Sequence, residues 1–380
     1  MRRVYSLLSS RHQKRAQKYQ SHSLILSVLV LAFMLTGLVS AEAAGRQEGN
    51  ADSQSQDTVT VVDNAERTVT VALPVERAAV ALRFNSELIR AIGANDRVIA
   101  VDMNTAQDRE FWKEFNPEQT IGRGQRELNY EKIIELDPQV LILPKNGSWE
   151  EAQEVLAPFG IEVLVVSGYD TADFINQVTN LGKVFQEEEA AQEFMDWYNE
   201  VLSYIARSLE GQPRRTVFLE TLNEFATTFE GDFFYDMVRF SHGEHIFRTR
   251  PHGITGTVID PEDVIREDPD VIVKMITPDH ALRGTGLSEA PLIEQRRRVI
   301  NEMKNRPAWE DIAAVQNNEV YVMSQFGHGG ASKLVGAAYM AKWIYGDLLP
   351  DLDPVEVERR WMEDFQGFHF VEGHFYPVPR

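Results

Sequence analysis

Short runs of aliphatic residues alternate along the chain with segments whose apolar positions recur at helical spacing. Continuous Val, Ile and Leu runs of this length are typical of parallel strands that helices cover on both faces. The pattern therefore predicts an α/β fold with parallel-rich sheets. The predicted strands occupy residues 78–82, 98–101, 140–143, 161–166, 216–219, 271–273 and 319–323. The predicted helices occupy residues 86–92, 130–136, 149–159, 172–185, 187–209, 232–240, 261–266, 296–305, 330–345 and 353–365.

Two local patterns add detail to this outline. Residues 58–63 and 67–71 alternate between apolar and polar side chains around a turn, which predicts an antiparallel hairpin. In the helix at 86–92, Ser86 would cap the first turn and Gly93 would end it. The longest helical pattern, interrupted only at Gly182-Lys183, separates two similar α/β halves and ends at Gly211-Gln212-Pro213.

The N-terminal segment has the layout of an export signal. Residues 1–23 are basic and polar, residues 24–40 carry no charge, and Ala41-Glu42-Ala43 offers small residues for cleavage after Ala43. An uncleaved anchor is the alternative, because the apolar run is at the short limit for a spanning helix. Both interpretations place the rest of the chain outside the cytoplasmic membrane. Residues 44–57 are polar and predict a disordered leader.

Composition and motifs narrow the chemistry. The 380 residues include 58 acidic and 38 basic ones, a net charge of −20, and no cysteine. This composition excludes disulfides, thiolate chemistry and lipid attachment through cysteine, and it argues against nucleic-acid binding. The Gly-x-Gly sequences at 122–124 and 284–286 lack the third glycine of a dinucleotide fingerprint, and no phosphate-binding loop or Gly-x-Ser-x-Gly motif occurs. We therefore do not expect an enzyme.

One short motif occurs in both halves. Residues 129–138 and 260–269 each combine a short helix, a Glu near its start, an Asp-Pro break and a following apolar strand. The acids are Glu131 and Glu262. A first-turn Glu also stabilises a helix through its dipole, so a purely local role is the alternative to a functional one.

In their order and spacing, these segments resemble the substrate-binding proteins of ABC importers of the iron–siderophore, cobalamin and haem type (class III). The resemblance covers about residues 58–365. It rests on the segments Asp63–Val71, Pro74–Arg77, Ile92–Ala100, Asn129–Pro138 and Trp309–Asn317.

The resemblance implies two Rossmann-like lobes, at 58–186 and 210–380, joined by a single long α-helix at 187–209, with a ligand cleft between the lobes. The C-terminal lobe would include a helical tail. It implies capture of an iron chelate, with cobalamin or haem as the alternative, and no intrinsic cofactor. The partners would be an ABC permease, met through Glu131 and Glu262, and its cytoplasmic ATPase. A monomer is expected.

Ligands of open α/β sheets bind beyond the carboxyl ends of the strands, which selects particular loops. The loops are 83–85, 102–104, 122–125, 145–149, 168–169, 220–223, 248–252, Thr277 and 325–332. Basic side chains there would hold an anionic chelate, and aromatic ones would pack on a planar ligand. Solvated loop charge and lobe packing are the alternatives. The candidates are Arg83, Phe84, Arg123, Lys145, Trp149, Tyr169, Arg248, Arg250, His252, Phe326 and His328.

The glycine-rich segment 327–333 follows a predicted strand and opens a helix. Its backbone N–H groups would suit an anion, and His328 is the best-placed side chain for a polar ligand or a metal. A tight strand-to-helix turn is the alternative. His242 and His245 lie three residues apart and form a second weak metal candidate. An exported metal-dependent enzyme using these histidines is therefore the competing hypothesis from another class, and a ligand sensor is a third.

Overall fold

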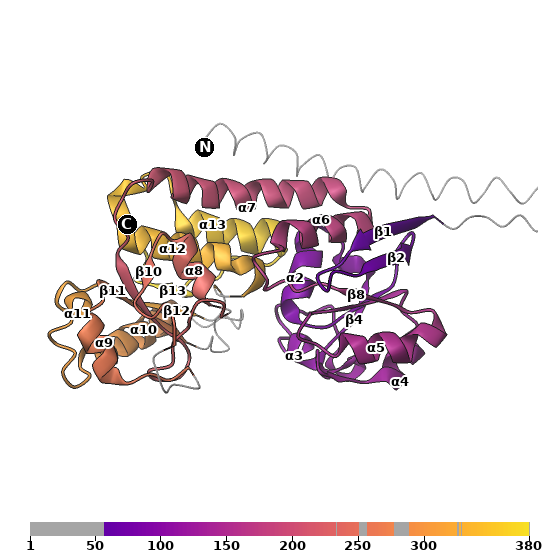
Figure 1. The fold of residues 1–380 in the computed structure, drawn as a ribbon, viewed down its shortest axis with the longest axis horizontal. Helices are drawn as coiled ribbons and strands as arrows, with labels where there is room; N and C mark the ends of the chain where they lie inside the picture. Colours follow the sequence, from indigo (N-terminus) through magenta and orange to yellow (C-terminus); the bar gives the residue numbers. More distant parts are fainter. Residues whose placement is uncertain are drawn as a thin grey trace, which may run out of the picture. The chain divides into compact units, whose positions relative to one another are not determined.

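The computed structural model describes residues 57–232, 234–250, 257–276, 289–324, 327 and 329–379. Within these ranges two separate, mainly parallel sheets are each covered by helices (Figure 1). The α/β fold with two lobes and one long connecting helix, predicted from the sequence, is confirmed.

The first sheet lies in the N-terminal lobe. Its four parallel strands have the order β4-β3-β7-β8. All were predicted, although β3 and β8 are shorter than their apolar runs. The strands are β3 (Ala78–Val80), β4 (Val98–Val101), β7 (Val140–Leu143) and β8 (Glu162–Val165).

The predicted hairpin is attached to one edge of this sheet. It consists of β1 (Thr58–Val62) and β2 (Thr68–Ala72), paired in antiparallel register. The buried Asp63 carboxylate forms the attachment, because it accepts hydrogen bonds from the Val165 amide (3.0 Å) and from the Arg67 guanidinium (2.6 Å).

Helices and a small second hairpin complete the N-terminal lobe. The predicted start at Ser86 is wrong: α2 begins at Arg83, and its cap position is Leu82, whose φ is +79°. The helices are α2 (Arg83–Ala91), α3 (Met103–Ala106), α4 (Tyr130–Leu136) and α5 (Trp149–Leu156). The small hairpin pairs β5 (Gly122–Gly124) with β6 (Glu127–Leu128).

Two consecutive helices lead out of the first lobe, and the longer of them connects it to the second. They are α6 (Phe174–Phe185) and α7 (Glu188–Ser208), and α7 extends over both lobes in Figure 1. The break lies at Gln186, whose φ is +55°, between the helices predicted at 172–185 and 187–209. The interruption predicted at Gly182-Lys183 is wrong, because both residues lie inside α6. Gly182 instead allows close packing within the bend, since a Cβ atom there would lie 2.8 Å from Ala191 Cβ. With 21 residues, α7 is about 31 Å long.

The second sheet lies in the C-terminal lobe and has the order β10-β9-β11-β12-β13. Only β13 is antiparallel to its neighbour. The strands are β9 (Thr216–Glu220), β10 (Glu244–His245), β11 (Val271–Ile276), β12 (Val320–Ser324) and β13 (Phe375–Tyr376). The helices beside them are α8 (Tyr235–Phe240), α9 (Pro261–Glu267), α10 (Glu289–Lys304) and α11 (Ala313–Gln316).

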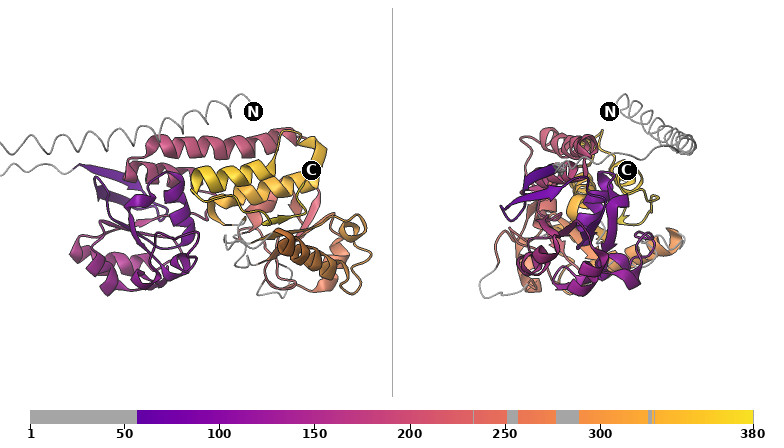
Figure 2. Two further views of the ribbon diagram at one scale, coloured as in Figure 1. Left: turned by 180° about the vertical axis from the view of Figure 1, so that it is seen from behind. Right: turned by 90° about the vertical axis from the view of Figure 1, so that its right-hand side faces the viewer.

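The C-terminal segment contacts both lobes. It contains α12 (Lys333–Tyr345), α13 (Pro354–Arg360) and a π-helical turn (Trp361–Phe365), and both helices lie beneath α7 in Figure 2. Beyond them, Gln366 donates a 3.0 Å hydrogen bond to the Glu87 carbonyl in α2. The chain then returns to the second sheet as β13, so the predicted helical tail ends in a strand.

Alternate side chains of each strand enter different cores. Val80, Ile142 and Leu219 belong to a large core that also includes side chains of α7 and α12. Leu141 faces a separate N-terminal core, and Ile272 faces a separate C-terminal one. The period of two is that of strands buried on both faces. Because the large core is shared, the lobes are packed together along α7.

Candidate functional site

A pocket of about 170 Å³ opens at the carboxyl ends of β3 and β4. Three of the loops selected from the sequence meet there. The pocket is lined by Leu82, Arg83, Phe84, Asp102, Asn104, Thr105 and Gln125. This edge of the sheet faces the other lobe, because α2, which begins there, packs on the Gly330–Ser332 turn. The pocket is therefore placed where a ligand between the lobes would bind.

Arg83 supplies the positive charge of this pocket. Its Nε atom lies 3.7 Å from Glu87 Oε1, and its guanidinium lies 5.0 Å from the centre of the Phe84 ring. About a third of the side chain, 35%, is exposed. The guanidinium is thus oriented from two sides and still reaches solvent, as an anion-binding group requires.

Glu87 lies behind Arg83 in the same helix. Burial of its carboxyl group raises its pKa to about 7, and the positive charges of Arg83 and Arg90 only partly oppose this rise. The carboxyl group therefore titrates near neutral pH.

Asp102 joins the ends of the two strands that form the pocket. Its Oδ2 atom accepts a 2.7 Å hydrogen bond from the Leu82 amide and a 2.9 Å bond from the Thr105 hydroxyl. Burial raises its pKa, and these hydrogen bonds lower it in part. Its loop is among those selected from the sequence, although Asp102 itself was not a predicted site residue. An Asp-x-x-Thr sequence directly after a buried strand was the available signal.

Phe84 forms the junction between the lobes. Its side chain is buried against the backbone of Gly329 and Gly330, where a Cβ atom on Gly329 would lie 2.0 Å from Phe84 Cε1. These two glycines therefore accommodate an aromatic ring in the structure. Next to them, the buried Lys333 donates from Nζ to the Tyr169 carbonyl at 2.9 Å. The Tyr169 backbone is thus part of the same junction.

The remaining N-terminal candidates lie apart from the pocket. The Trp149 ring is covered by the Arg67 guanidinium, 4.4 Å from the ring centre, on the hairpin side. Arg123 is exposed and lies 3.8 Å from Glu127, and Lys145 is exposed. The structure does not bring these three side chains together with Arg83.

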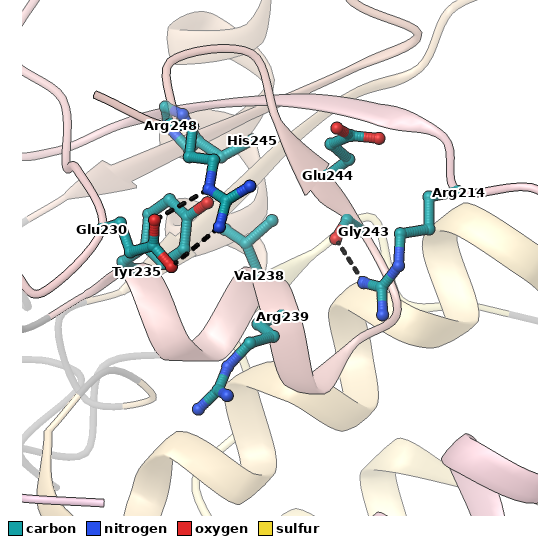
Figure 3. A pocket seen from close by; sticks show the side chains of 9 residues that line it. All are labelled: Arg214, Glu230, Tyr235, Val238, Arg239, Gly243, Glu244, His245 and Arg248. Atoms are coloured by element: carbon teal, nitrogen blue, oxygen red, sulfur yellow. Dashed lines mark hydrogen bonds and ion pairs between the residues drawn. The ribbon is translucent and has the colours of Figure 1, made fainter. Parts of the chain in front are cut away.

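In the C-terminal lobe, Arg248 and Arg250 form ion pairs with a neighbouring loop. Arg248 Nε lies 2.8 Å from Glu230 Oε2, and Arg250 lies 3.1 Å from Asp232 and over the Phe229 ring. Arg248 also lines a second pocket of about 200 Å³ along the outer strand β10 (Figure 3). Carboxylates already neutralise its charge there.

The two nearby histidines face different surroundings. His245 is buried, lies 3.0 Å from the Thr227 hydroxyl, and accepts a hydrogen bond from the Phe247 amide. Burial lowers its pKa to about 4, so the ring is neutral. His242 instead lies 3.2 Å from the Gln212 carbonyl and contacts Tyr345. Among the described residues no cluster of three His, Asp or Glu side chains could hold a metal. His252, Thr277, Phe326 and His328 lie outside the described residues.

The repeated motif has the same geometry in both lobes. Asn129 and Asp260 cap α4 and α9, and each helix ends at a left-handed aspartate, with φ of +48° at Asp137 and +43° at Asp268. Glu131 and Glu262 are exposed in the first turns. In Figure 1 both helices lie on the side of the molecule opposite α7.

Two parallel-sheet lobes, a connecting helix and a pocket at the strand ends of the N-terminal lobe are the arrangement of a two-lobed solute-binding protein. The sequence model of one family, described as periplasmic binding protein, matches residues 79–325. The chain belongs to this family.

Known proteins with similar sequences or structures agree with this assignment. An uncharacterized ABC transporter substrate-binding lipoprotein, YvrC of Bacillus subtilis, is 23% identical over 84% of this chain and 96% of its own. The TroA-like periplasmic binding protein FepB of Veillonella parvula has a TM-score of 0.66 at 20% identity, covering 82% of this chain and 97% of its own. The molybdate-bound MolA of Haemophilus influenzae has a TM-score of 0.62 at 15% identity, covering 82% and 99%. Within the part of the chain that the structure describes, every helix is too short or too polar to cross a membrane.

Proposed function

We propose that this protein is the exported solute-binding component of an ABC importer, and that it captures an iron chelate between its lobes. Family membership supports the solute-binding role, and the relative YvrC is named as an ABC transporter substrate-binding protein. The permease and its ATPase are then the partners that receive the ligand and drive its transport.

The single observation that supports the ligand class is the Arg83 pocket. A partly exposed guanidinium stands beside the Asn104 and Gln125 side chains at the strand ends. Such groups form charge-assisted and neutral hydrogen bonds with carboxylate, catecholate or hydroxamate oxygens. Haem and cobalamin are the alternatives within this family, and they would rely more on apolar walls than on Arg83.

Glu131 and Glu262 are proposed to dock on the permease. Both are exposed, both stand at the start of matched helices, and both would pair with arginines of a partner. Paired surface charges of this kind set register and association rate more than affinity.

Export is proposed to use residues 24–40, with cleavage after Ala43. YvrC is named a lipoprotein, whereas this chain has no cysteine to carry a lipid. The mature protein would therefore act in the periplasm without a lipid anchor, or be held at the membrane if the apolar segment is retained. Mass spectrometry of the exported protein distinguishes the two forms.

Thermal melting of purified residues 44–380 tests the ligand assignment. The probes are ferric catecholate, hydroxamate and carboxylate chelates, their iron-free forms, haem, cobalamin, molybdate and free metal ions. We expect one ferric chelate to raise the melting midpoint in a concentration-dependent way. The shift should disappear in Arg83→Gln and persist in Arg207→Gln, an exposed arginine of α7. A shift with haem or cobalamin alone would select the alternative, and no shift with any ferric chelate would refute the iron assignment.

Uptake measurements test the transport role separately. The double variant Glu131→Ala, Glu262→Ala should abolish ligand uptake by cells while the purified protein binds with wild-type affinity. Glu135→Ala and Glu267→Ala change exposed acids in the same helices and serve as matched controls. Normal uptake in the double variant would contradict the docking role. A deletion strain with normal uptake would favour the sensor hypothesis.

A further inference from the structure

The turn between β3 and α2 is short and strained. Only Ala81 and Leu82 separate the strand from the helix, and Leu82 has φ +79° and ψ 118°. A positive φ is common for glycine and rare for a residue with a bulky side chain. A non-glycine residue persists there only when surrounding contacts hold it, and such residues concentrate at functional sites.

Several hydrogen bonds hold this turn. The Leu82 amide donates to Asp102 Oδ2 at 2.7 Å, and the Leu82 carbonyl accepts from the Asn85 amide at 2.9 Å. The Asn85 side chain donates to the Ala81 carbonyl at 3.2 Å and accepts from the Gly168 amide at 2.9 Å. Of these groups, the Asp102 carboxylate is the one that binds the strained residue itself from another part of the chain, just after β4.

Asp102 is itself rigidly placed. It is the first residue after β4, is buried, and accepts hydrogen bonds from the Thr105 amide at 3.2 Å and the Thr105 hydroxyl at 2.9 Å. Because β3 and β4 are adjacent parallel strands, the carboxylate connects the ends of both strands at the pocket.

The conformation of Leu82 determines the direction in which Arg83 leaves the sheet. Arg83 is the first residue of α2, directly after the strained position, and its side chain lines the pocket. We propose that Asp102 is a positioning residue, which holds Leu82 in its strained conformation and thereby aims the Arg83 guanidinium at the ligand. The ligand-contact part of this inference rests on the proposed function, whereas the control of the turn does not.

A purely structural role makes a different prediction. If Asp102 only caps α3, its removal lowers stability and leaves the Leu82 turn and the ligand affinity unchanged. Asp353→Ala is the matched control, because Asp353 caps α13 by accepting from the Val355 and Glu356 amides, far along the chain from the pocket.

Amide hydrogen exchange measured on the ligand-free protein tests control of the turn. We expect Asp102→Ala to accelerate exchange at Leu82 by about tenfold or more, since a buried hydrogen bond is lost. Asp353→Ala should leave exchange at Leu82 unchanged. Wild-type protection of Leu82 in Asp102→Ala would overturn the inference, whatever ligand the protein binds.

The second part of the inference is that Asp102 aims Arg83 at the ligand. It is tested by measuring affinity for the ferric chelate that gives the largest melting shift. Asp102→Ala should weaken binding by about tenfold or more, and adding Leu82→Gly should restore most of the loss, because glycine adopts this φ without strain. Failure of Leu82→Gly to restore binding would overturn the aiming role. If no ferric chelate shifts melting, the proposed function fails and the exchange experiment still decides the role of Asp102.

Discussion

The Lys333 ammonium group in α12 and the Tyr169 carbonyl in the N-terminal lobe form a 2.9 Å hydrogen bond across the lobe junction. Burial lowers the pKa of Lys333 to about 8, while the charges of Asp236 and Asp170 oppose this shift. Asp236 also accepts a hydrogen bond from the Thr171 hydroxyl. Polar contacts as well as the shared core therefore hold the lobes together beside the pocket.

Adding a methyl group at this junction should destabilise the protein, and removing the ring that it overlaps should relieve the effect. In Gly329→Ala the new methyl group would overlap the Phe84 ring, so we expect a loss of about 1–3 kcal/mol in the free energy of unfolding. Phe84→Ala removes the overlapping ring, and the double variant should lose at least about 1 kcal/mol less than the sum of the single losses. Urea unfolding of the three variants measures this coupling. Additive losses would show that the ring and the glycine do not compete for space.

Removing the carboxylate of a buried ion triad should strongly lower the free energy of unfolding of the C-terminal lobe. The fully buried Glu220 lies 2.7 Å from Lys274 Nζ and 2.9 Å from Arg306 Nη2. Glu220→Leu leaves two cations without their carboxylate and should cost about 3–5 kcal/mol. Glu230→Gln breaks the exposed pair with Arg248 and should change stability little. Equal effects in urea unfolding would contradict the triad's role.

The N-terminal hairpin should depend on Asp63. Its carboxylate accepts from the amides of Ala65, Arg67 and Val165 and from the Arg67 guanidinium. Asp63→Asn removes the charge and places an N–H group against donors, so we expect a loss of about 3 kcal/mol. Asp57→Asn, at an exposed position just before β1, is the control. In Asp63→Asn, a protease should cut first near the hairpin. If Asp63→Asn resists the protease as well as wild type does, Asp63 does not hold the hairpin to the sheet.

Glu358 should make stability fall as pH rises. Burial raises its pKa from 4.5 to about 8, although the hydrogen bond from Tyr339 lowers it in part. Between these values the folded protein holds a proton that the unfolded chain has released. Stability from this group is therefore present below pH 4.5 and is lost toward pH 8, at up to about 1.4 kcal/mol per pH unit.

Comparing Glu358→Gln with wild type isolates this effect. The neutral amide keeps an acceptor for Tyr339, so the variant's stability should depend less on pH between 5 and 8. Glu154→Gln, at an exposed position, should follow the wild-type curve. Parallel melting curves for wild type and Glu358→Gln would show that the Glu358 carboxyl is ionised in the folded protein throughout this range.

The elements that could be predicted are those with a local signal. Val140–Leu143 forms β7 as predicted because its continuous apolar run suits a strand buried on both faces. Helices α4 and α9 end where Asp137 and Asp268 precede proline, since the residue before a proline disfavours helical backbone. Strands β10 and β13 were missed because each contains only two residues.

The parts that could not be predicted depend on contacts between distant residues. Phe84 was predicted as a ligand contact from its loop alone; it lines the pocket, and only the fold shows that its ring also packs on Gly329 and Gly330 of the other lobe. Arg248 was selected by its charge, and only the fold brings Glu230 next to it. Leu82 carries no signal of its positive φ, because the turn is held by Asp102 and not by a glycine.

Residues 366–368 return to the first lobe and close part of its surface. Gln366 bonds to α2, and Phe368 packs on Phe111, with ring centres 5.1 Å apart. Residues 366–368 thus cover a surface of the first lobe, although 279 residues separate Gln366 from Glu87 along the chain. A chain ending before residue 361 should therefore expose Phe111 to protease. The surface of the first lobe is therefore complete only when residues 366–368 are in place.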